Sequence, residues 1–591
     1  MEKEISKIEK MRHTASHVLA QAVLKLYPDT KLGIGPAIDN GFYYDFDFVE
    51  PITEKDLSKI ESEMKKIAKQ KLPLTQTSMS REDAEEYLKN TEQDYKLDLL
   101  KDIPDEEISF FSSGDNEFVD LCRGPHIENT KQIGYFRLLK TAGAYWRGDE
   151  KKKMLTRIYG VSFETKDELK KHLLNLEEAE KRNHRVLGKQ LELYAIFNEI
   201  GQGLPVWLPR GYVITRILED YMIKLERSYG YEHTLTPHIN KSVLFETSGH
   251  LKFYKDSMYP PIKVDDEEYY LKPMNCPAGM LIYKMKPKSY RELPYKLGEL
   301  GTVYRYEKSG ELHGLQRVRG FTQNDAHLFC TPKQLEDVIN ETFDMLDVFY
   351  KDVGFDNYKF RLSTSDTEKN PEKYIGDPEK WKHAEEILRN VLVKRKVEFE
   401  EVLGDAAFYG PKVDVQAVNV FGKEDSISTI QLDFNLPEKF EISYIDVDGK
   451  EKQPYVIHRA LIGSFERFFA FLIEHHGGDF PLWFTPEQVR IVPISDSHLE
   501  YAKEVLTDLK KNDLRATLDE RSKSMQSKIR DAEKMKVPYI VIIGDKEIET
   551  ETLSIRSRLN KEIGLMKKQE FIDFLKEEIL TKGIKEDSSN K

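Results

Sequence analysis

The sequence has little cysteine, no long apolar run and no excess of positive charge, and each shortage excludes a class of protein. Three cysteines in 591 residues, Cys122, Cys276 and Cys330, cannot form a disulfide framework, and their small odd number suits a reducing compartment. No apolar run approaches the roughly 20 residues of a membrane-spanning helix. The start MEKEISKIEK is too charged for the core of a signal peptide. We therefore expect a cytoplasmic protein with no membrane partner.

The charge balance and the length narrow the class further. Lys and Arg number 90 against 103 Asp and Glu, a net charge of −13, so a nucleic acid could be bound only by local basic patches. Hydrophobic residues make up 39% of the chain, which is enough for packed cores and argues against global disorder. One hydrophobic core stops growing at roughly 250–300 residues, so this chain must contain several domains.

Periodicity predicts an α+β multidomain protein. The N-terminal part mixes helices and strands, with a turn at the Asn40-Gly41 pair. Helices and short strands then alternate in irregular order, which favours an antiparallel sheet flanked by helices. Strand and helix alternate at the C-terminal end, as in a compact α/β module. We expect an N-terminal α+β domain (1–164), a linker helix that Thr165 and Glu168 begin with a capping box (165–191), a central domain (192–485) and a C-terminal α/β domain (486–591).

Cys276, His327 and His458 stand in three separate segments of the central domain, KPMNCPAG, TQNDAHLFC and YVIHRALIG. A thiolate and two neutral imidazoles are ligands that zinc prefers, and three protein ligands leave a position open for a substrate. Their wide separation matches no short zinc-finger pattern. From spacing alone, a shared metal site and ordinary buried side chains both remain open.

Arginines flank the same segments. Arg305, Arg317 and Arg319 precede His327, and Arg467 follows His458. A guanidinium can hold two phosphate oxygens at once, which suits a nucleoside triphosphate. The central domain has neither a Walker A nor a GxGxxG loop, so arginines would have to hold such a ligand. Ion pairs within the protein are the alternative for any single arginine.

Two further pairs share one spacing near the N-terminus. His13 and His17 lie four residues apart on one face of a predicted helix, and Cys122 and His126 repeat that interval in DLCRGPH. HxxxH with CxxxH is a plausible metal set. From the residues alone, a zinc site and a site without metal are both open.

The order of the central motifs carries a family resemblance. The run YRYE with the loop to Arg317 resembles motif 2 of class II aminoacyl-tRNA synthetases, Gly463 with Arg467 resembles motif 3, and the helix ending near Gly230, with the Pro237 strand, resembles motif 1. KPMNCP, LHGLQRVRGFTQNDAH, AAFYGPK, TIQLDF and IHRALIG are together similar to the threonyl-tRNA synthetase family, and the match covers nearly the whole chain. The resemblance implies a class II antiparallel sheet between an N-terminal editing domain and a C-terminal anticodon-binding domain.

For the reaction, the resemblance implies ATP-dependent ligation of L-threonine to tRNA(Thr) through a threonyl-adenylate, in a homodimer with one Zn²⁺ per subunit and Mg²⁺ bound with ATP. Zinc that binds an amino group and a hydroxyl rejects valine, whereas serine loses only a methyl, worth roughly 1–3 kcal/mol, and leaks through. The residues implied are Cys276, His327 and His458 as zinc ligands, Arg305 at the α-phosphate, Arg317 and Arg467 at the γ-phosphate, Glu307 at the adenine, and Gln323, Asp325, Tyr409 and Gln431 around the amino acid.

The expected misactivation of serine agrees with a second resemblance, which lies in the N-terminal domain. HTASH, GFYYDF, DLCRGPH and TAGAYWRGD look like the editing domain of that family, which hydrolyses mischarged seryl-tRNA without requiring a stable metal. The implied residues are His13, His17, Lys96, Asp120, Cys122 and His126. A histidine or the Lys96 amine could order the attacking water, and the base is left open.

The C-terminal domain resembles the anticodon-binding domain of a subgroup of class II synthetases, with Lys546, Glu547 and Arg556 as the implied contacts. Basic residues gather at its second predicted helix, namely Arg521, Lys523, Lys528, Arg530, Lys534 and Lys536. Two features depart from the family. Ala278-Gly279 replace its usual Gly-His, and the sequence begins at the editing unit, without the small ubiquitin-like domain of many relatives.

Two other functions compete with this interpretation. A catalytically silent paralogue would bind tRNA without activating an amino acid, but the arginines of motifs 2 and 3 and the three zinc candidates are all intact. A stand-alone editing hydrolase would not need the central domain.

Overall fold

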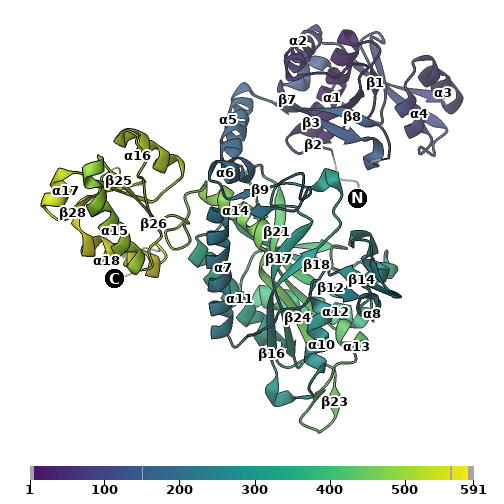
Figure 1. Cartoon of the computed structure of the whole chain (residues 1–591). Helices are drawn as coiled ribbons and strands as arrows, with labels where there is room; N and C mark the ends of the chain where they lie inside the picture. Colours follow the sequence, from purple (N-terminus) through teal and green to yellow (C-terminus); the bar gives the residue numbers. More distant parts are fainter. Residues whose placement is uncertain (1–4, 150, 559–561, 584–591) are drawn as a thin grey trace. The chain divides into compact units, whose positions relative to one another are not determined.

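A computed structural model describes residues 5–149, 151–558 and 562–583. The chain divides into two compact units, Met1–Glu177 and Glu178–Lys591 (Figure 1). Among the described residues, no helix is both long and apolar enough to cross a bilayer.

The first unit packs helices against a small antiparallel sheet. Helix α1 begins at a capping box between Ser6 and Glu9 and buries Ala15 and Leu19 against α2 and the sheet. The strand order of that sheet is β1-β3-β8-β7, with β2 paired to β3, and a second sheet has the order β4-β5-β6. The elements are α1 (Lys7–Leu26), α2 (Glu54–Gln70), α3 (Arg81–Asn90), α4 (Asp94–Leu100), β1 (Lys31–Leu32), β2 (Ala37–Ile38), β3 (Gly41–Asp47), β4 (Leu74–Ser80), β5 (Glu107–Ser113), β6 (Phe118–Leu121), β7 (Tyr135–Tyr145) and β8 (Met154–Phe163).

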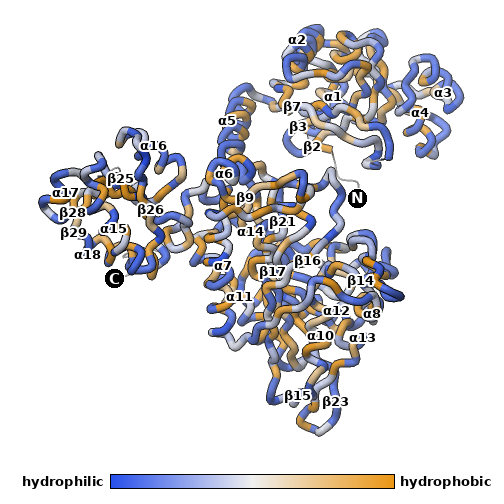
Figure 2. Tube along the Cα trace, in the orientation of Figure 1, coloured by the Kyte–Doolittle hydropathy of each residue, from blue (hydrophilic) through white to orange (hydrophobic). Residues whose placement is uncertain are grey.

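The linker expected as one helix over 165–191 is two helices. α5 (Lys166–Arg182) ends before Asn183, and α6 (His184–Gln190) begins after it. The Asn183 side chain accepts the N–H of Arg185 at 2.9 Å, so this residue caps a new helix rather than continuing the old one. Figure 2 shows α5 as mostly hydrophilic, and Ala179 is its one buried residue.

The second unit is built on an eight-stranded sheet of order β11-β16-β17-β24-β21-β20-β18-β19. Its pairings are antiparallel except for β11 with β16 and β18 with β19, as expected for a class II core. Apolar side chains of α7, α11, α12 and α14 share one hydrophobic core with this sheet. The elements are β11 (Glu232–His233), β16 (Tyr295–Tyr304), β17 (Gly320–Cys330), β18 (Tyr358–Thr364), β19 (Phe399–Leu403), β20 (Lys412–Val418), β21 (Glu424–Asp433), β24 (Tyr455–Ser464), α7 (Pro209–Ser228), α11 (Leu335–Val353), α12 (Pro378–Lys394) and α14 (Phe465–His476).

Smaller elements surround this sheet. Short strands form the sheets β10-β9, β12-β14-β13 and β15-β22-β23. The elements are β9 (Tyr194–Ala195), β10 (Val206–Trp207), β12 (Ile239–Lys241), β13 (Ile262–Val264), β14 (Glu267–Leu271), β15 (Lys288–Ser289), β22 (Tyr444–Ile445), β23 (Glu451–Lys452), α8 (Ser242–Thr247), α9 (His250–Phe253), α10 (Cys276–Lys284) and α13 (Leu436–Lys439).

The C-terminal part of the second unit has its own sheet, β26-β25-β27-β28-β29, and its own core. The strands around β25 are parallel and those after β27 are antiparallel, so the module is mixed α/β. Its first five elements follow the predicted order of strand and helix. The elements are β25 (Val489–Pro493), β26 (Ala516–Leu518), β27 (Tyr539–Ile543), β28 (Thr552–Ser557), β29 (Gly564–Lys567), α15 (Leu499–Lys511), α16 (Met525–Lys534), α17 (Asp545–Glu549) and α18 (Lys568–Leu580).

Candidate functional site

Three candidate zinc ligands meet beside the central sheet although they are far apart in sequence. His327 on β17 lies opposite His458 on β24 in the antiparallel register, and their ring centroids are 4.9 Å apart. Cys276 is the first residue of α10. One ligand atom from each residue lies within 4.8 Å of the other two, and all three residues are buried. Cys330 is buried in the main core and lies outside this cluster.

The donor set fits a metal ion. Nε2 of His327 is buried and has no hydrogen-bond partner among the described residues, which a bound cation would provide. Nε2 of His458 lies 2.9 Å from Oδ2 of Asp433, so the carboxylate orients the ring and leaves Nδ1 for an ion. Burial lowers the pKa of His327 to about 4, so the ring is neutral at pH 7. Burial raises the pKa of the Cys276 thiol, and a cation would stabilise the thiolate.

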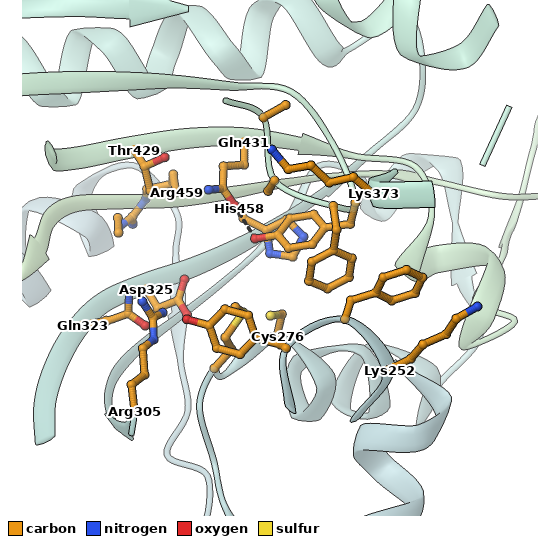
Figure 3. Close-up of a pocket in the computed structure, with 18 residues that line it drawn as sticks. Lys252, Cys276, Arg305, Gln323, Asp325, Lys373, Thr429, Gln431, His458 and Arg459 are labelled. Carbon is orange, nitrogen blue, oxygen red and sulfur yellow. Dashed lines mark hydrogen bonds between the residues drawn. The ribbon is translucent and has the colours of Figure 1, made fainter. Parts of the chain in front are cut away.

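A cavity of about 580 Å³ opens beside Cys276 and His458. In Figure 3, Arg305, Gln323 and Asp325 gather at one end of it, and the Lys252 amine lies at the other. The four residues predicted to surround an amino acid, Gln323, Asp325, Tyr409 and Gln431, all line this cavity.

Hydrogen bonds hold these polar groups in place. The Asn275 amide donates to Oδ2 of Asp325 at 3.1 Å, and the Tyr409 hydroxyl donates to Oε1 of Gln431. Gln431 on β21 also pairs with His458 across the sheet. The carboxylate and amide are therefore fixed beside the candidate metal site, where they could bind the amino and hydroxyl groups of a small polar ligand.

A second cavity, of about 230 Å³, shares a wall with the first. The residues that line both are Arg305, Gln323, Thr429, Gln431 and Ala460. The predicted phosphate contacts Arg317 and Arg467 and the predicted adenine contact Glu307 line the second cavity. Arg305 thus lies where the two cavities meet.

The arginines of the second cavity are held in different ways. Arg467 on α14 donates from Nε to the Gln316 carbonyl at 2.9 Å and from Nη1 to the Ser426 carbonyl at 3.0 Å. Arg317 is half-exposed and pairs with Glu307 at 2.9 Å and Glu311 at 2.8 Å. A ligand with several phosphate oxygens could displace these carboxylates, because ion pairs open to solvent are weak.

The N-terminal candidates also come together. His13 and His17 on α1 face Cys122 and His126, which follow β6, and ligand atoms of all four lie within 4.8 Å of one another. The Cys122 sulfur is 3.4 Å from Nε2 of His13 and 3.3 Å from Nε2 of His126. Nδ1 of His126 lies 3.0 Å from the Thr14 hydroxyl. The cluster has the spacing of a metal site and equally that of a polar catalytic pocket.

Burial keeps this N-terminal cluster uncharged. Burial lowers the pKa of His13, of His17 and of His126, and burial raises the pKa of Cys122 to about 11. At neutral pH the cluster therefore consists of a thiol and three neutral imidazoles, and the unprotonated nitrogen of an imidazole can accept a hydrogen bond or a proton from a water.

An ionic network adjoins the same histidines. Lys96 on α4 lies 2.6 Å from Oδ1 of Asp120, and His17 lies 3.8 Å from Oδ2 of the same carboxylate. Tyr44 on β3 donates to Asp120 at 2.5 Å and accepts from Lys96 at 2.9 Å. All of these residues are buried, so the Lys96–Asp120 ion pair is held in place by the Tyr44 hydroxyl and shielded from bulk water.

The three residues predicted to contact the anticodon differ in their exposure. Lys546 is exposed on α17, whereas the Glu547 carboxylate is buried and accepts the N–H of Gly544 at 2.9 Å. Arg556 lies partly exposed on β28. Glu547 therefore stabilises its own helix start, whatever else it contacts.

Four of the predicted basic residues of the C-terminal module have roles within the protein, and Arg530 and Lys534 are exposed. Arg521 and Lys523 pair with Asp531, and Lys536 pairs with Asp479. Lys528 is buried, with its amine 3.3 Å from the Pro493 carbonyl. The positive patch expected at this helix is thus smaller than the sequence suggested.

Sequence reasoning missed three residues that orient the sites: Asp433, Asn275 and Tyr44. Asp433 follows Gln431 by two positions, so both side chains lie on one face of β21. A carboxylate inside the apolar run TIQLDF was the available signal, because a buried charge needs a partner. Tyr44 stands within GFYYDF, but nothing in its local pattern indicates Asp120.

Models of three protein families match the chain. The tRNA synthetase class II core domain (G, H, P, S and T) matches residues 259–476, the anticodon binding domain matches 488–578, and the threonyl and alanyl tRNA synthetase second additional domain matches 108–159. The matches confirm the expected fold class, an α+β chain with a class II core.

Curated relatives match over almost the whole chain. A threonine–tRNA ligase from Aquifex aeolicus is 48% identical over 97% of this chain and 90% of its own length, and one from Dehalococcoides mccartyi is 46% identical over 98% of both. Among solved structures, the RNA binding domain of threonyl-tRNA synthetase from Cryptosporidium parvum superposes with a TM-score of 0.63 at 35% identity, covering 67% of this chain and 98% of its own.

Proposed function

The chain belongs to the threonine–tRNA ligases, class II aminoacyl-tRNA synthetases, and from this we propose that it activates threonine as an adenylate at the central sheet and edits seryl-tRNA in the N-terminal unit. The wall shared by the two central cavities carries the proposal, because a mixed anhydride must form where an amino-acid pocket meets a triphosphate pocket.

In the first step, a threonine carboxylate oxygen attacks the α-phosphorus of ATP, and pyrophosphate leaves. Arg305, at the shared wall, stabilises the charge that develops on the α-phosphate. Arg317 and Arg467 bind the γ-phosphate end and bend the triphosphate, with Mg²⁺ as its counter-ion. In the second step, a ribose hydroxyl at the tRNA terminus attacks the threonyl carbonyl, and AMP leaves.

Cys276, His327 and His458 would hold the zinc ion, with Asp433 orienting His458. The ion supplies, when bound, open coordination positions for the amino group and hydroxyl of threonine, which valine cannot fill. Asp325 accepts a hydrogen bond from the substrate amino or hydroxyl group, and Tyr409 and Gln431 close the pocket around the side chain. Serine keeps the hydroxyl and passes this selection.

Editing removes that error. The N-terminal pocket binds the seryl ester, and one of its neutral histidines or Lys96 orders the water that attacks the carbonyl. The Lys96 ammonium, fixed by Asp120, is placed to stabilise the oxyanion. A pocket that excludes the extra methyl of threonine protects the correct product.

The active enzyme is proposed to be a homodimer that binds tRNA through its C-terminal module, with Lys546, Glu547 and Arg556 near the anticodon. Exposed apolar side chains on α7 and just after β11 support dimerisation: Tyr212 is 56% exposed and Leu235 is 78% exposed. Unpaired anticodon bases are read by stacking and by hydrogen bonds to their edges.

Exchange of pyrophosphate into ATP tests the synthetic proposal. We expect exchange with threonine, weaker exchange with serine and almost none with valine, together with one zinc per chain. A chain that binds tRNA(Thr) but supports no exchange would be a silent paralogue. Equal exchange with valine and threonine would overturn selection by zinc.

A further inference from the structure

We propose that His184, at the start of α6, is a positioning residue for ATP. It holds the turn His313–Arg317 against α14 and thereby fixes the positions of the Arg317 and Arg467 side chains. The inference rests on the proposed function for the identity of the ligand. It concerns a residue of the linker, outside the three class II motifs.

One side of the His184 ring is fixed to α14. His184 is completely buried, and its Nδ1 lies 2.7 Å from Oε1 of Glu474. Its backbone N–H donates to the same oxygen at 3.2 Å, and Oε2 of Glu474 accepts the N–H of Val420 at 3.1 Å. Because a carboxylate only accepts, Nδ1 carries the ring proton. Glu474 thus joins the linker to the helix that carries Arg467.

The other side of the ring supports the turn. Nε2 of His184 accepts the N–H of Leu315 at 3.3 Å, which requires this nitrogen to be unprotonated. Gly314 lies directly on the ring: a Cβ there would be 2.1 Å from Nε2 of His184, and its φ is +50°. The close approach therefore needs glycine at this position, and the imidazole determines how far the turn lies from α6.

Both arginines are attached to this turn. The N–H groups of Gln316 and Arg317 donate to the His313 carbonyl at 2.9 and 3.3 Å, which closes the turn. The Gln316 carbonyl accepts Nε of Arg467 at 2.9 Å. A shift of the turn away from the ring therefore moves Arg317 and breaks the contact that orients Arg467.

His184 itself does not touch the nucleotide. Both of its nitrogens are used within the protein, and it does not line the cavity that holds Arg317 and Arg467. The neutral ring is suited to its two partners, because it donates to a carboxylate on one side and accepts from a backbone amide on the other. Lysine or arginine could not make the second bond.

Two amide substitutions separate the two sides of the ring. His184→Asn retains a donor near Nδ1 for Glu474 but loses the acceptor for Leu315, whereas His184→Gln places a carbonyl oxygen near Nε2. In pyrophosphate exchange with the full chain, we expect His184→Asn to raise the KM for ATP about tenfold, since one buried hydrogen bond is lost. The KM for threonine and the bound zinc should stay unchanged. His184→Gln should recover most of the affinity for ATP.

Gly314→Ala tests the same contact from the turn, and it carries the test if His184→Asn does not fold. We expect the same selective rise in the KM for ATP. An unchanged KM for ATP in Gly314→Ala and in folded His184→Asn would overturn the proposal, as would equal rises for ATP and threonine accompanied by lost zinc. The wild-type chain checks the proposed function separately: no threonine-dependent exchange there counts against that function, not against the role of His184.

Discussion

The carboxylate of Asp433 lies 2.9 Å from Nε2 of His458, while its other oxygen accepts the backbone N–H groups of Asn435 and Leu436. The aspartate therefore connects the end of β21 to the ring of a candidate zinc ligand. A carboxylate that is hydrogen-bonded to a metal-binding imidazole fixes the orientation of the ring and raises its basicity.

Asp433→Asn should weaken zinc binding without removing the site. The amide oxygen can still accept the N–H groups of Asn435 and Leu436, but the negative charge at His458 is lost. We expect zinc affinity to fall about 10–100-fold, measured by competition with a chelator. Asp519→Asn, which changes a buried carboxylate paired with Arg521, is the control and should leave zinc affinity unchanged. Equal affinity in Asp433→Asn and the wild type would contradict the orienting role.

Cys276→Ser should remove the bound zinc and the threonine-dependent exchange together. Serine is a poor zinc ligand, because its hydroxyl stays protonated at neutral pH. Cys330→Ser is a matched control, since both thiols are buried but Cys330 lies outside the cluster. We expect metal analysis to find about one zinc per chain in the control and none in Cys276→Ser. Retention of zinc in Cys276→Ser would reject this ligand set.

Arg467→Ala should impair ATP binding more than threonine binding. The substitution removes a half-buried cation that lines the second cavity and leaves the Gln316 and Ser426 carbonyls without their donor. We expect kcat/KM for ATP to fall about a hundredfold or more, as a charged hydrogen bond of roughly 3 kcal/mol is lost. Arg361→Ala, at a surface pair with Glu400, should change it little. A comparable loss in both variants would argue for a structural effect alone.

His13→Ala should let seryl-tRNA accumulate without slowing threonine activation. The imidazole is part of the N-terminal cluster, and the central cavities do not include it. We expect deacylation of seryl-tRNA to fall about a hundredfold, as for loss of a general base or a water-positioning group. His172→Ala on α5 is the control, because that ring lies outside the cluster. Unchanged deacylation in His13→Ala would count against the editing pocket.

The Cys122 thiol should react slowly with iodoacetamide at neutral pH. Burial raises its pKa to about 11, and only the thiolate is nucleophilic. The rate should therefore keep rising about tenfold per pH unit from pH 7 to 10, whereas an unperturbed thiol levels off near pH 8.5. Mass spectrometry of the labelled peptide gives the rate, with the denatured chain as the reference. A plateau near pH 8.5 in the native chain would contradict the raised pKa of Cys122.

Local sequence motifs predict many of the candidate site residues, but they do not predict how these residues come together in the fold. Short motifs single out Cys276, His327 and His458 as candidates, but their spacing leaves a shared site open, and the ligand set follows only from the family resemblance. That the two histidines face each other depends on the register of β17 and β24, which is set by long-range packing. The role of Asp433 became visible only with that register.

Charge patterns were the least informative part of the sequence. The linker shows a continuous helical pattern of charged residues, yet Asn183 ends one helix and caps the next through a side-chain hydrogen bond. The basic residues at and around α16 predict a positive surface, but ion pairs with Asp531 of the same helix and with Asp479, and the burial of Lys528, reduce it. Sequence gives the sign of a charge, whereas only the fold supplies its partner.

The two candidate centres lie in units with separate hydrophobic cores, one containing Leu19 and Phe42 and the other Leu328 and Phe468. Damage to one core need not soften the other. On the proposed function, proofreading and the supply of threonyl-tRNA would therefore be separately exposed to selection, because a substitution that weakens one core leaves the other intact.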